Sequence, residues 1–268
     1  MAKTKKFHLP CGFFSDPTND PSRMLKHRVF DLLKSPDFNQ QLNSLKEFPF
    51  PKILNRLFAA LCSEDEEIKW HAVTAMGFLV ADLAERDLEG ARNILRRMMW
   101  SLNEESGGIG WGLPEAMGEI LARNQDLARE FSPLLVSYLQ PDGNFLEFEP
   151  LQRGVLWAIA RLAESHPQIL QFLEADSYLL AFLSSPDAPT RGHAIRALGQ
   201  IGKKESLLGL EAYLQDETEI PLYENQEFRR VRISQLAREA RKLSLGFDTR
   251  EQDPESAFEP SRYPPRKV

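Results

Sequence analysis

Two glutamates, Glu115 and Glu119, are the residues of this sequence whose type and spacing could do chemistry. They lie four positions apart in the segment ESGGIGWGLPEAMGEI, so a helix would place both carboxylates on one face. Such a pair could act as paired carboxylates or as metal ligands, although a solvated acidic patch is the commoner arrangement. The sequence contains no HExxH, CxxC or GxSxG motif, and we therefore expect no catalytic residues.

The same segment begins with four closely spaced glycines, which look like a phosphate-binding loop. They are Gly107, Gly108, Gly110 and Gly112. No Gly-Lys-Ser/Thr follows them, and the third glycine of a dinucleotide motif would fall at Leu113 or Glu115 instead. We therefore expect no nucleotide here. Two alternatives remain: the glycines pack closely against a neighbouring helix, or they leave a bare backbone that a ligand or partner chain can approach.

Pro114 and Trp111 make the start of this helix unusual. Proline lacks the N–H that continues a helix, so either the helix begins late, with Pro114 in its first turn, or it is kinked there. Trp111 beside bare backbone would suit a recognition surface, because tryptophan is enriched among binding hot spots.

Five similar segments indicate where this helix belongs in the chain. They are IKWHAVTAMG (68–77), IGWGLPEAMG (109–118), LQRGVLWAIA (151–160), TRGHAIRALG (190–199) and the weaker FRRVRISQLA (228–237). Their first residues are 41, 42, 39 and 38 positions apart. A period of about 40 residues predicts a helical solenoid in which each repeat holds two helices. The quoted segments are the predicted second helices.

The predicted first helix of each repeat is an apolar run with three- and four-residue spacing, just upstream of the second. These runs are PKILNRLFAALC (51–62), LEGARNILRRMMWSL (88–102), LAREFSPLLVSYL (127–139), QILQFLEADSYLLAFL (168–183) and KESLLGLEAYL (204–214). Trp100 and Cys62 fall at the ends of two runs, and we expect both side chains in the core. Pro186 and Asp187 predict the start of another helix.

This pattern resembles the HEAT-repeat (armadillo-type) family, and more narrowly bacterial proteins with the short HEAT-like repeats first noted in phycobilisome lyases (PBS-lyase HEAT-like repeats). The resemblance covers roughly residues 50–243, and its best copy is TRGHAIRALGQIG. It implies an all-α fold, an α/α superhelical solenoid of about five HEAT-like helix pairs with an N-terminal helical cap. Such repeats serve many roles, so the resemblance indicates the fold better than the function.

The expected organisation has four parts. They are an extended N-terminal segment (1–20), a helical cap (21–48), the repeat solenoid (49–245) and a tail rich in proline and charge that is extended or disordered (246–268). Phe258 and Tyr263 could dock this tail onto the solenoid or onto a partner.

The second helices would place one set of side chains on the concave face, which the resemblance implies is the usual binding surface. Positions three and seven of each segment share the face opposite the buried residues. With the positions one turn further, they are Trp70, Thr74, Trp111, Glu115, Glu119, Arg153, Trp157, Arg161, Gly192, Arg196, Arg230 and Ser234. A stripe of tryptophan and charge suits a protein or peptide ligand, unless the rings are half-buried between adjacent helices.

Metal and cofactor sites are not expected. His71 and His193 share a repeat position but lie three repeats apart, which is too far to share an ion. His8 and Cys11 form an HxxC pair near the N-terminus, and two ligands in a flexible segment are a weak metal signal. We therefore expect neither a metal nor a cofactor.

Composition limits the class of partner and the compartment. The net charge of −6 and the pI of about 5.5 make nucleic acid an unlikely partner. Two cysteines are too few for a disulfide framework, so we expect a cytoplasmic protein. No stretch approaches about 18 uninterrupted apolar residues, so we expect no membrane span.

We interpret the sequence as a non-enzymatic interaction module, namely an adaptor, assembly factor or regulatory subunit that binds a protein or peptide on its concave face. The resemblance to lyases implies a bilin-handling protein as an alternative, although no lyase-specific residue set is present. A HEAT-like family also excises alkylated DNA bases, but Glu115 and Glu119 in the middle of the stripe would repel phosphates. The sequence leaves the oligomeric state open.

Overall fold

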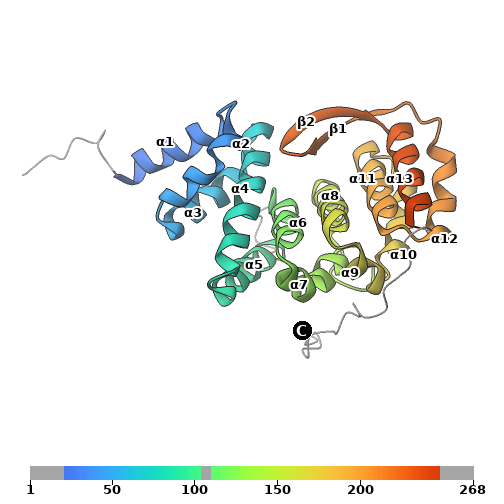
Figure 1. Cartoon of the computed structure of the whole chain (residues 1–268), viewed down its shortest axis with the longest axis horizontal. Coiled ribbons are helices and arrows are strands. Elements are labelled where there is room, and N and C mark those ends of the chain that lie inside the picture. The colour runs from blue at the N-terminus through green and yellow to red at the C-terminus, as the bar shows by residue number, and fades with distance from the viewer. Residues whose placement is uncertain (1–20, 104–109, 248–268) are drawn as a thin grey trace, which may run out of the picture.

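The chain forms a curved row of paired helices crossed by one β-hairpin (Figure 1). A computed structural model describes residues 21–103 and 110–247. The second helices of the repeats are α4 (Glu66–Ala84), α6 (Leu113–Arg123), α8 (Glu149–Ser165), α11 (Ala188–Ile201) and α13 (Ile233–Phe247). Each packs against the next to form one layer. The solenoid predicted from the repeat is therefore confirmed.

The first helices form the other layer. The first three are α3 (Phe50–Leu61), α5 (Leu88–Leu102) and α7 (Gln125–Ser137), close to the predicted runs. In the fourth repeat the predicted helix is divided into α9 (Pro167–Phe172), α10 (Ala175–Leu179) and the 3-10 helix η3 (Leu180–Ser184). The division falls at Glu174, whose φ of 51° is left-handed and cannot continue a helix.

The two ends of the described chain contain shorter helices. The fifth repeat begins with α12 (Lys204–Leu207) and the 3-10 helix η4 (Leu208–Tyr213). Ahead of the first repeat lie α1 (Pro21–Leu33), α2 (Phe38–Gln41) and the 3-10 helix η2 (Leu42–Glu47), and α1 packs on both α3 and α4. The apolar side of the first repeat is therefore covered.

Side-chain caps fix where several helices begin. Asp65, Asp87, Asn124 and Asp187 each accept a hydrogen bond from a backbone N–H in the first turn of the following helix. Such caps satisfy N–H groups that have no partner inside the helix, and each contributes about 1 kcal/mol. The helix start predicted from Pro186 and Asp187 is therefore correct.

Small residues at the end of each repeat segment let the second helices approach closely. A Cβ on Gly118 of α6 would overlap Ala158 of α8, and a Cβ on Gly199 of α11 would overlap Ala240 of α13. The repeated pattern of alanine, an apolar residue and glycine is thus a packing device. It sets the spacing of the layer that carries the concave face.

The glycine-rich segment resolves into a late helix start. Helix α6 begins at Leu113, with Pro114 in its first turn, so the helix is not kinked at the proline. Gly112 precedes it with a φ of 70°, and a Cβ there would lie 2.9 Å from the backbone oxygen of Leu61. A Cβ on Gly110 would lie 2.8 Å from the Leu102 side chain.

These contacts favour close packing over an open backbone at both positions. Gly107 and Gly108 lie outside the described residues, as do residues 1–20 and 248–268.

The helix predicted for Phe228–Ala237 is wrong in its first half. The chain forms an antiparallel hairpin of β1 (Glu219–Glu224) and β2 (Glu227–Arg232) before α13 begins. Asn225 and Gln226 make the two-residue turn, with φ of 51° and 68°. Both positive angles match the turn geometry that fits the twist of paired strands.

Alternation of side chains explains why this stretch is a hairpin. Ile220, Leu222 and Val231 are buried on one face of the two strands. The Ile220 side chain occupies the space beside Gly192 on α11. A helix could not put these residues on a single face, whereas strands with a period of two can.

Two expectations about the core are also wrong. Trp100 is 75% exposed, because the buried stripe of α5 runs through Ile94, Leu95 and Met98 and continues at Leu102. Cys62 is a free, exposed thiol just beyond the end of α3. No helix in the described part of the chain is long and apolar enough to cross a bilayer.

Candidate binding groove

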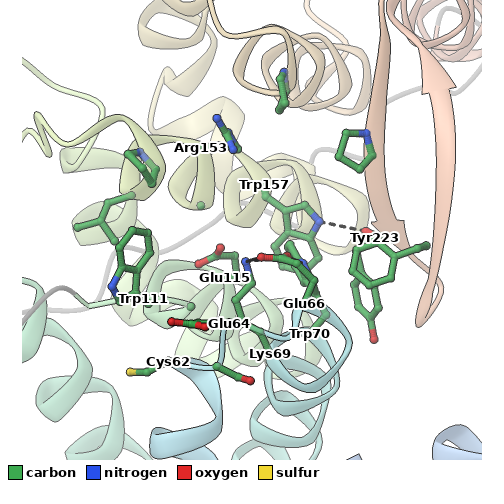
Figure 2. Close-up of a pocket in the computed structure, with 18 of the residues that line it drawn as sticks. Cys62, Glu64, Glu66, Lys69, Trp70, Trp111, Glu115, Arg153, Trp157 and Tyr223 are labelled. Carbon is green, nitrogen blue, oxygen red and sulfur yellow. Dashed lines mark hydrogen bonds and ion pairs between the residues drawn. The ribbon is translucent and has the colours of Figure 1, made fainter. Parts of the chain in front are cut away.

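The concave face contains a pocket of about 680 Å³ bounded by the second helices and the hairpin (Figure 2). Five of the twelve residues predicted for the concave face line it: Trp70, Trp111, Glu115, Arg153 and Trp157. Pro221, Tyr223 and Phe228 of the hairpin form another wall. We refer to this pocket as the groove. That its side chains bind a ligand stays a prediction.

A smaller pocket of about 150 Å³ is lined by four more of the predicted residues, namely Thr74, Glu119, Arg161 and Arg196. Their charged groups already have partners within the chain. Glu119 accepts from Arg161 at 2.7 Å and from Arg123 at 2.6 Å. Arg196 Nη2 contacts Glu164 on α8 at 2.6 Å and Glu224 in the hairpin at 2.7 Å.

This alternating row of charges joins three second helices to the hairpin. Its ion pair between Arg196 and Glu224 connects α11 to the hairpin, and the other pairs connect the helices to one another.

The hairpin occupies part of the concave face through Tyr223. Its ring stacks on Trp70, with centroids 4.8 Å apart and planes at 23°. Its carbonyl oxygen accepts a hydrogen bond from Trp157 Nε1 at 3.0 Å, and its hydroxyl lies 2.9 Å from Thr74 Oγ1. Trp70 and Trp157 are buried by these contacts. Of the two alternatives from the sequence, burial therefore fits these two rings better than an open face, although the hairpin contributes to covering them.

Tyr223 was not among the predicted site residues, although the sequence contains a pattern that indicates its hairpin. The stretch EIPLYENQEFRRVR alternates on both sides of Asn225, a residue that tolerates positive φ. This hairpin pattern was overlooked because it overlaps the segment that continues the register of the helical repeat.

Trp111 keeps an accessible ring at the opposite side of the groove from Tyr223 (Figure 2). It is 39% exposed and makes an edge-on contact with the exposed ring of Phe148, with centroids 5.6 Å apart. Phe148 immediately precedes α8. The two rings form an exposed apolar surface, of which Trp111 lines the groove and Phe148 lies beside it.

Glu115 is the carboxylate buried deepest in the groove, in the first turn of α6. It is only 7% exposed, and its Oε2 lies against Gly154, where a Cβ would come within 2.7 Å. Burial raises the pKa of Glu115. The charge of Lys69, a hydrogen bond from the backbone N–H of Glu115 itself and the charge of Arg153 offset that rise only in part. Among the described residues, no side chain forms a hydrogen bond or an ion pair with this carboxylate.

The two cations of the groove have acidic partners of their own. Lys69 Nζ lies 3.0 Å from Glu66, which also accepts from Trp70 Nε1 at 2.9 Å. Arg153 makes two bonds to Asp187, at 3.0 and 2.7 Å. The charge of each cation is therefore largely compensated, whereas the charge of Glu115 is not.

His193 on α11 is a second buried polar residue of the groove. It is 5% exposed, and its Nδ1 has no hydrogen-bond partner among the described residues. Burial, with Arg196 and Arg153 nearby, lowers the pKa of His193 to about 3. The ring is therefore neutral at physiological pH. Within residues 21–103 and 110–247, no three His, Cys, Asp or Glu side chains gather as a metal site.

The layered helix pairs and the concave groove define an α-solenoid repeat protein. Residues 149–201 match the family model of the HEAT-like repeat. An uncharacterized protein of Archaeoglobus fulgidus is 26% identical over 186 residues, which covers 68% of this chain and 92% of the relative.

Solved structures place the fold in the same class. A designed armadillo repeat protein matches with a TM-score of 0.51 and 20% identity, over 84% of this chain and 96% of its own. A designed armadillo repeat protein in complex with the peptide (KR)4 matches with a TM-score of 0.53 and 18% identity, over 84% and 95%. The chain therefore has the fold of the armadillo and HEAT-like repeat proteins.

Proposed function

We propose that this chain is a non-enzymatic interaction scaffold that holds an extended segment of another protein in its concave groove. The observation that carries the proposal is the way the groove holds Tyr223. One tryptophan stacks on the tyrosine ring, and another donates its indole N–H to the backbone carbonyl. These are the two contacts by which a surface recognises an extended chain: side-chain stacking and a main-chain hydrogen bond.

The open part of the groove offers the same kinds of contact. Trp111 and Phe148 present accessible rings, and the space of about 680 Å³ beside them accommodates several side chains. Tryptophan and arginine are enriched at the centres of protein interfaces. A peptide lying between Trp111 and the hairpin would cover the exposed ring of Trp111.

The similarity to designed armadillo repeat proteins supports this class of ligand, because one of them was solved in complex with a peptide. The proposed scaffold acts in the cytoplasm, as its two cysteines led us to expect. Base excision and bilin handling have less support. Arg161 and Arg196 are engaged by Glu119 and Glu164, so these arginines are poor ligands for phosphate.

A peptide selection tests the proposal directly. The full chain is immobilised and offered a phage library of random twelve-residue peptides, and selected peptides are titrated by fluorescence anisotropy. We expect Trp111→Ala to weaken the selected peptides by about tenfold or more, because an interface tryptophan contributes well above 1 kcal/mol.

Trp100→Ala is the matched control, because Trp100 is exposed on α5 and does not line the groove. It should leave affinity unchanged. A library that yields no binder, or equal losses in the two variants, would refute the scaffold proposal.

A further inference from the structure

No side chain neutralises the carboxylate of Glu115, and this indicates which charge a ligand of the groove would carry. Figure 2 shows this carboxylate projecting toward the centre of the lining side chains. It is more than nine-tenths buried, yet no described side chain binds it. A buried charge that no side chain neutralises is unfavourable, and a cation supplied from outside would offset this cost.

The remaining charges of the groove do not supply that cation. Lys69 is held by Glu66, and Arg153 is held by Asp187. Glu64 adds a further, exposed carboxylate to the lining. The groove therefore has an excess of negative charge next to the exposed ring of Trp111.

We propose that the groove selects segments carrying a lysine or arginine, whose cationic head pairs with the Glu115 carboxylate while its methylene stem lies along Trp111. This inference rests on the proposed function and adds the charge of the ligand. Long basic side chains suit such a place, because the stem can cover an aromatic ring while the head reaches a buried acid.

Neighbouring groups keep the site selective for a cation over an anion. A ligand carboxylate would meet Glu115 and Glu64 without a free cation to bind. The nearest guanidinium, of Arg153, would first have to release Asp187. Like charges at close range inside an interface discriminate strongly between partners.

Glu115 could pair with a cation, or in its protonated form it could donate a hydrogen bond to a ligand carbonyl. The direction in which ligand affinity changes with pH distinguishes these two alternatives. Lys69 and Glu66 on α4, Arg153 on α8 and His193 on α11 also face this part of the groove. If Glu115 pairs with a cation, affinity rises as the pH increases through its raised pKa. If the neutral acid donates, affinity falls over the same range.

The test is the peptide selection on the full chain. The selected peptides are sequenced to find positions at which one residue type occurs in all of them. We expect a fixed lysine or arginine in the peptides that bind the wild type. Glu115→Gln should weaken those peptides by about tenfold. It should not affect a peptide in which lysine is replaced by norleucine, or arginine by citrulline. Asp142→Asn removes the same formal charge from an exposed turn outside the groove and should change affinity by less than about threefold.

Each other outcome has a definite meaning. Binders without a fixed basic residue would overturn this inference and leave the scaffold proposal intact. Equal losses in Glu115→Gln and Asp142→Asn, or an affinity that falls with increasing pH, would do the same. A library that yields no binder at all would overturn both proposals.

Discussion

The hydroxyl oxygens of Thr74 and Tyr223 lie 2.9 Å apart, although 149 residues separate them along the chain. Thr74 belongs to the second helix of the first repeat, and Tyr223 to the hairpin that precedes the last helix. Repeats in a helical solenoid normally contact only their neighbours. This hydrogen bond therefore joins two ends of the array that the repeat pattern alone would keep apart.

Removing this hydrogen bond should destabilise the whole chain. Tyr223→Phe leaves the buried Thr74 hydroxyl without its partner, and we expect the free energy of unfolding to fall by about 1–2 kcal/mol. The measurement is urea unfolding followed by circular dichroism. Adding Thr74→Val should recover much of the loss, because both polar partners are then gone. Strictly additive losses in the double variant would contradict this account.

The turn of the hairpin should be open to improvement. Gln226 has a φ of 68°, which an L-residue other than glycine adopts at a cost of about 1–2 kcal/mol. Its buried Oε1 also has no hydrogen-bond partner in the described part of the chain. Gln226→Gly should therefore raise the free energy of unfolding by about 1 kcal/mol. Asn225→Gly is the control and should change little, because asparagine tolerates this conformation. A lower stability of Gln226→Gly would show that its side chain makes a necessary contact.

The close approach of adjacent second helices should tolerate no extra methyl group. Gly118→Ala would place a Cβ against the backbone of Ala158, and we expect a loss of about 1–3 kcal/mol in urea unfolding. Gly209→Ala adds the same atom where the nearest neighbouring atom, Leu183 Cδ1, is 3.6 Å away, so it should be close to neutral. If both variants had the same stability, the helix spacing would not depend on Gly118.

His193 should make stability sensitive to acid. Its pKa is lowered to about 3 in the folded chain, mainly by burial, whereas an unfolded histidine titrates near 6.5. The unfolded state then binds more protons between these values, so stability is present above pH 6.5 and falls as the pH decreases toward 3. In this window the stability of His193→Gln should fall less steeply, by up to about 1.4 kcal/mol per pH unit.

The check is a series of urea unfolding curves between pH 6.5 and 4, compared by slope because the substitution also changes packing. His166, whose pKa burial also lowers, is common to both proteins and cancels in this comparison. Parallel profiles would mean that the His193 ring can be protonated without unfolding.

The helical layer could be predicted from the sequence because every repeat has the same packing requirement. Small residues recur where helices touch, as at Gly118 and Gly199, so their spacing gives the register of the second helices. The same register brought Trp70, Trp111 and Trp157 to one pocket, since positions three and seven of a segment share a helix face.

The hairpin and its consequences could not be predicted in the same way. Its strands are six residues each, and pairing with distant helices decides their conformation more than local preference does. The burial of Trp70 and Trp157 follows from Tyr223, which lies far away in sequence. Trp100 could have been predicted correctly, because it falls outside the three- and four-residue stripe of α5.

The hairpin gives this solenoid a mechanical property that most repeat arrays lack. An open solenoid bends and stretches like a spring, because small changes between neighbouring repeats add up along its length. Here Tyr223, which lies in the hairpin before the last helix, contacts Trp70 and Thr74 in the first repeat. Figure 1 shows β1 and β2 above the layer of helices. These contacts constrain the curvature of the solenoid without a ligand. A ligand of the proposed groove would therefore meet a preformed surface, and less ordering of the chain would oppose its binding.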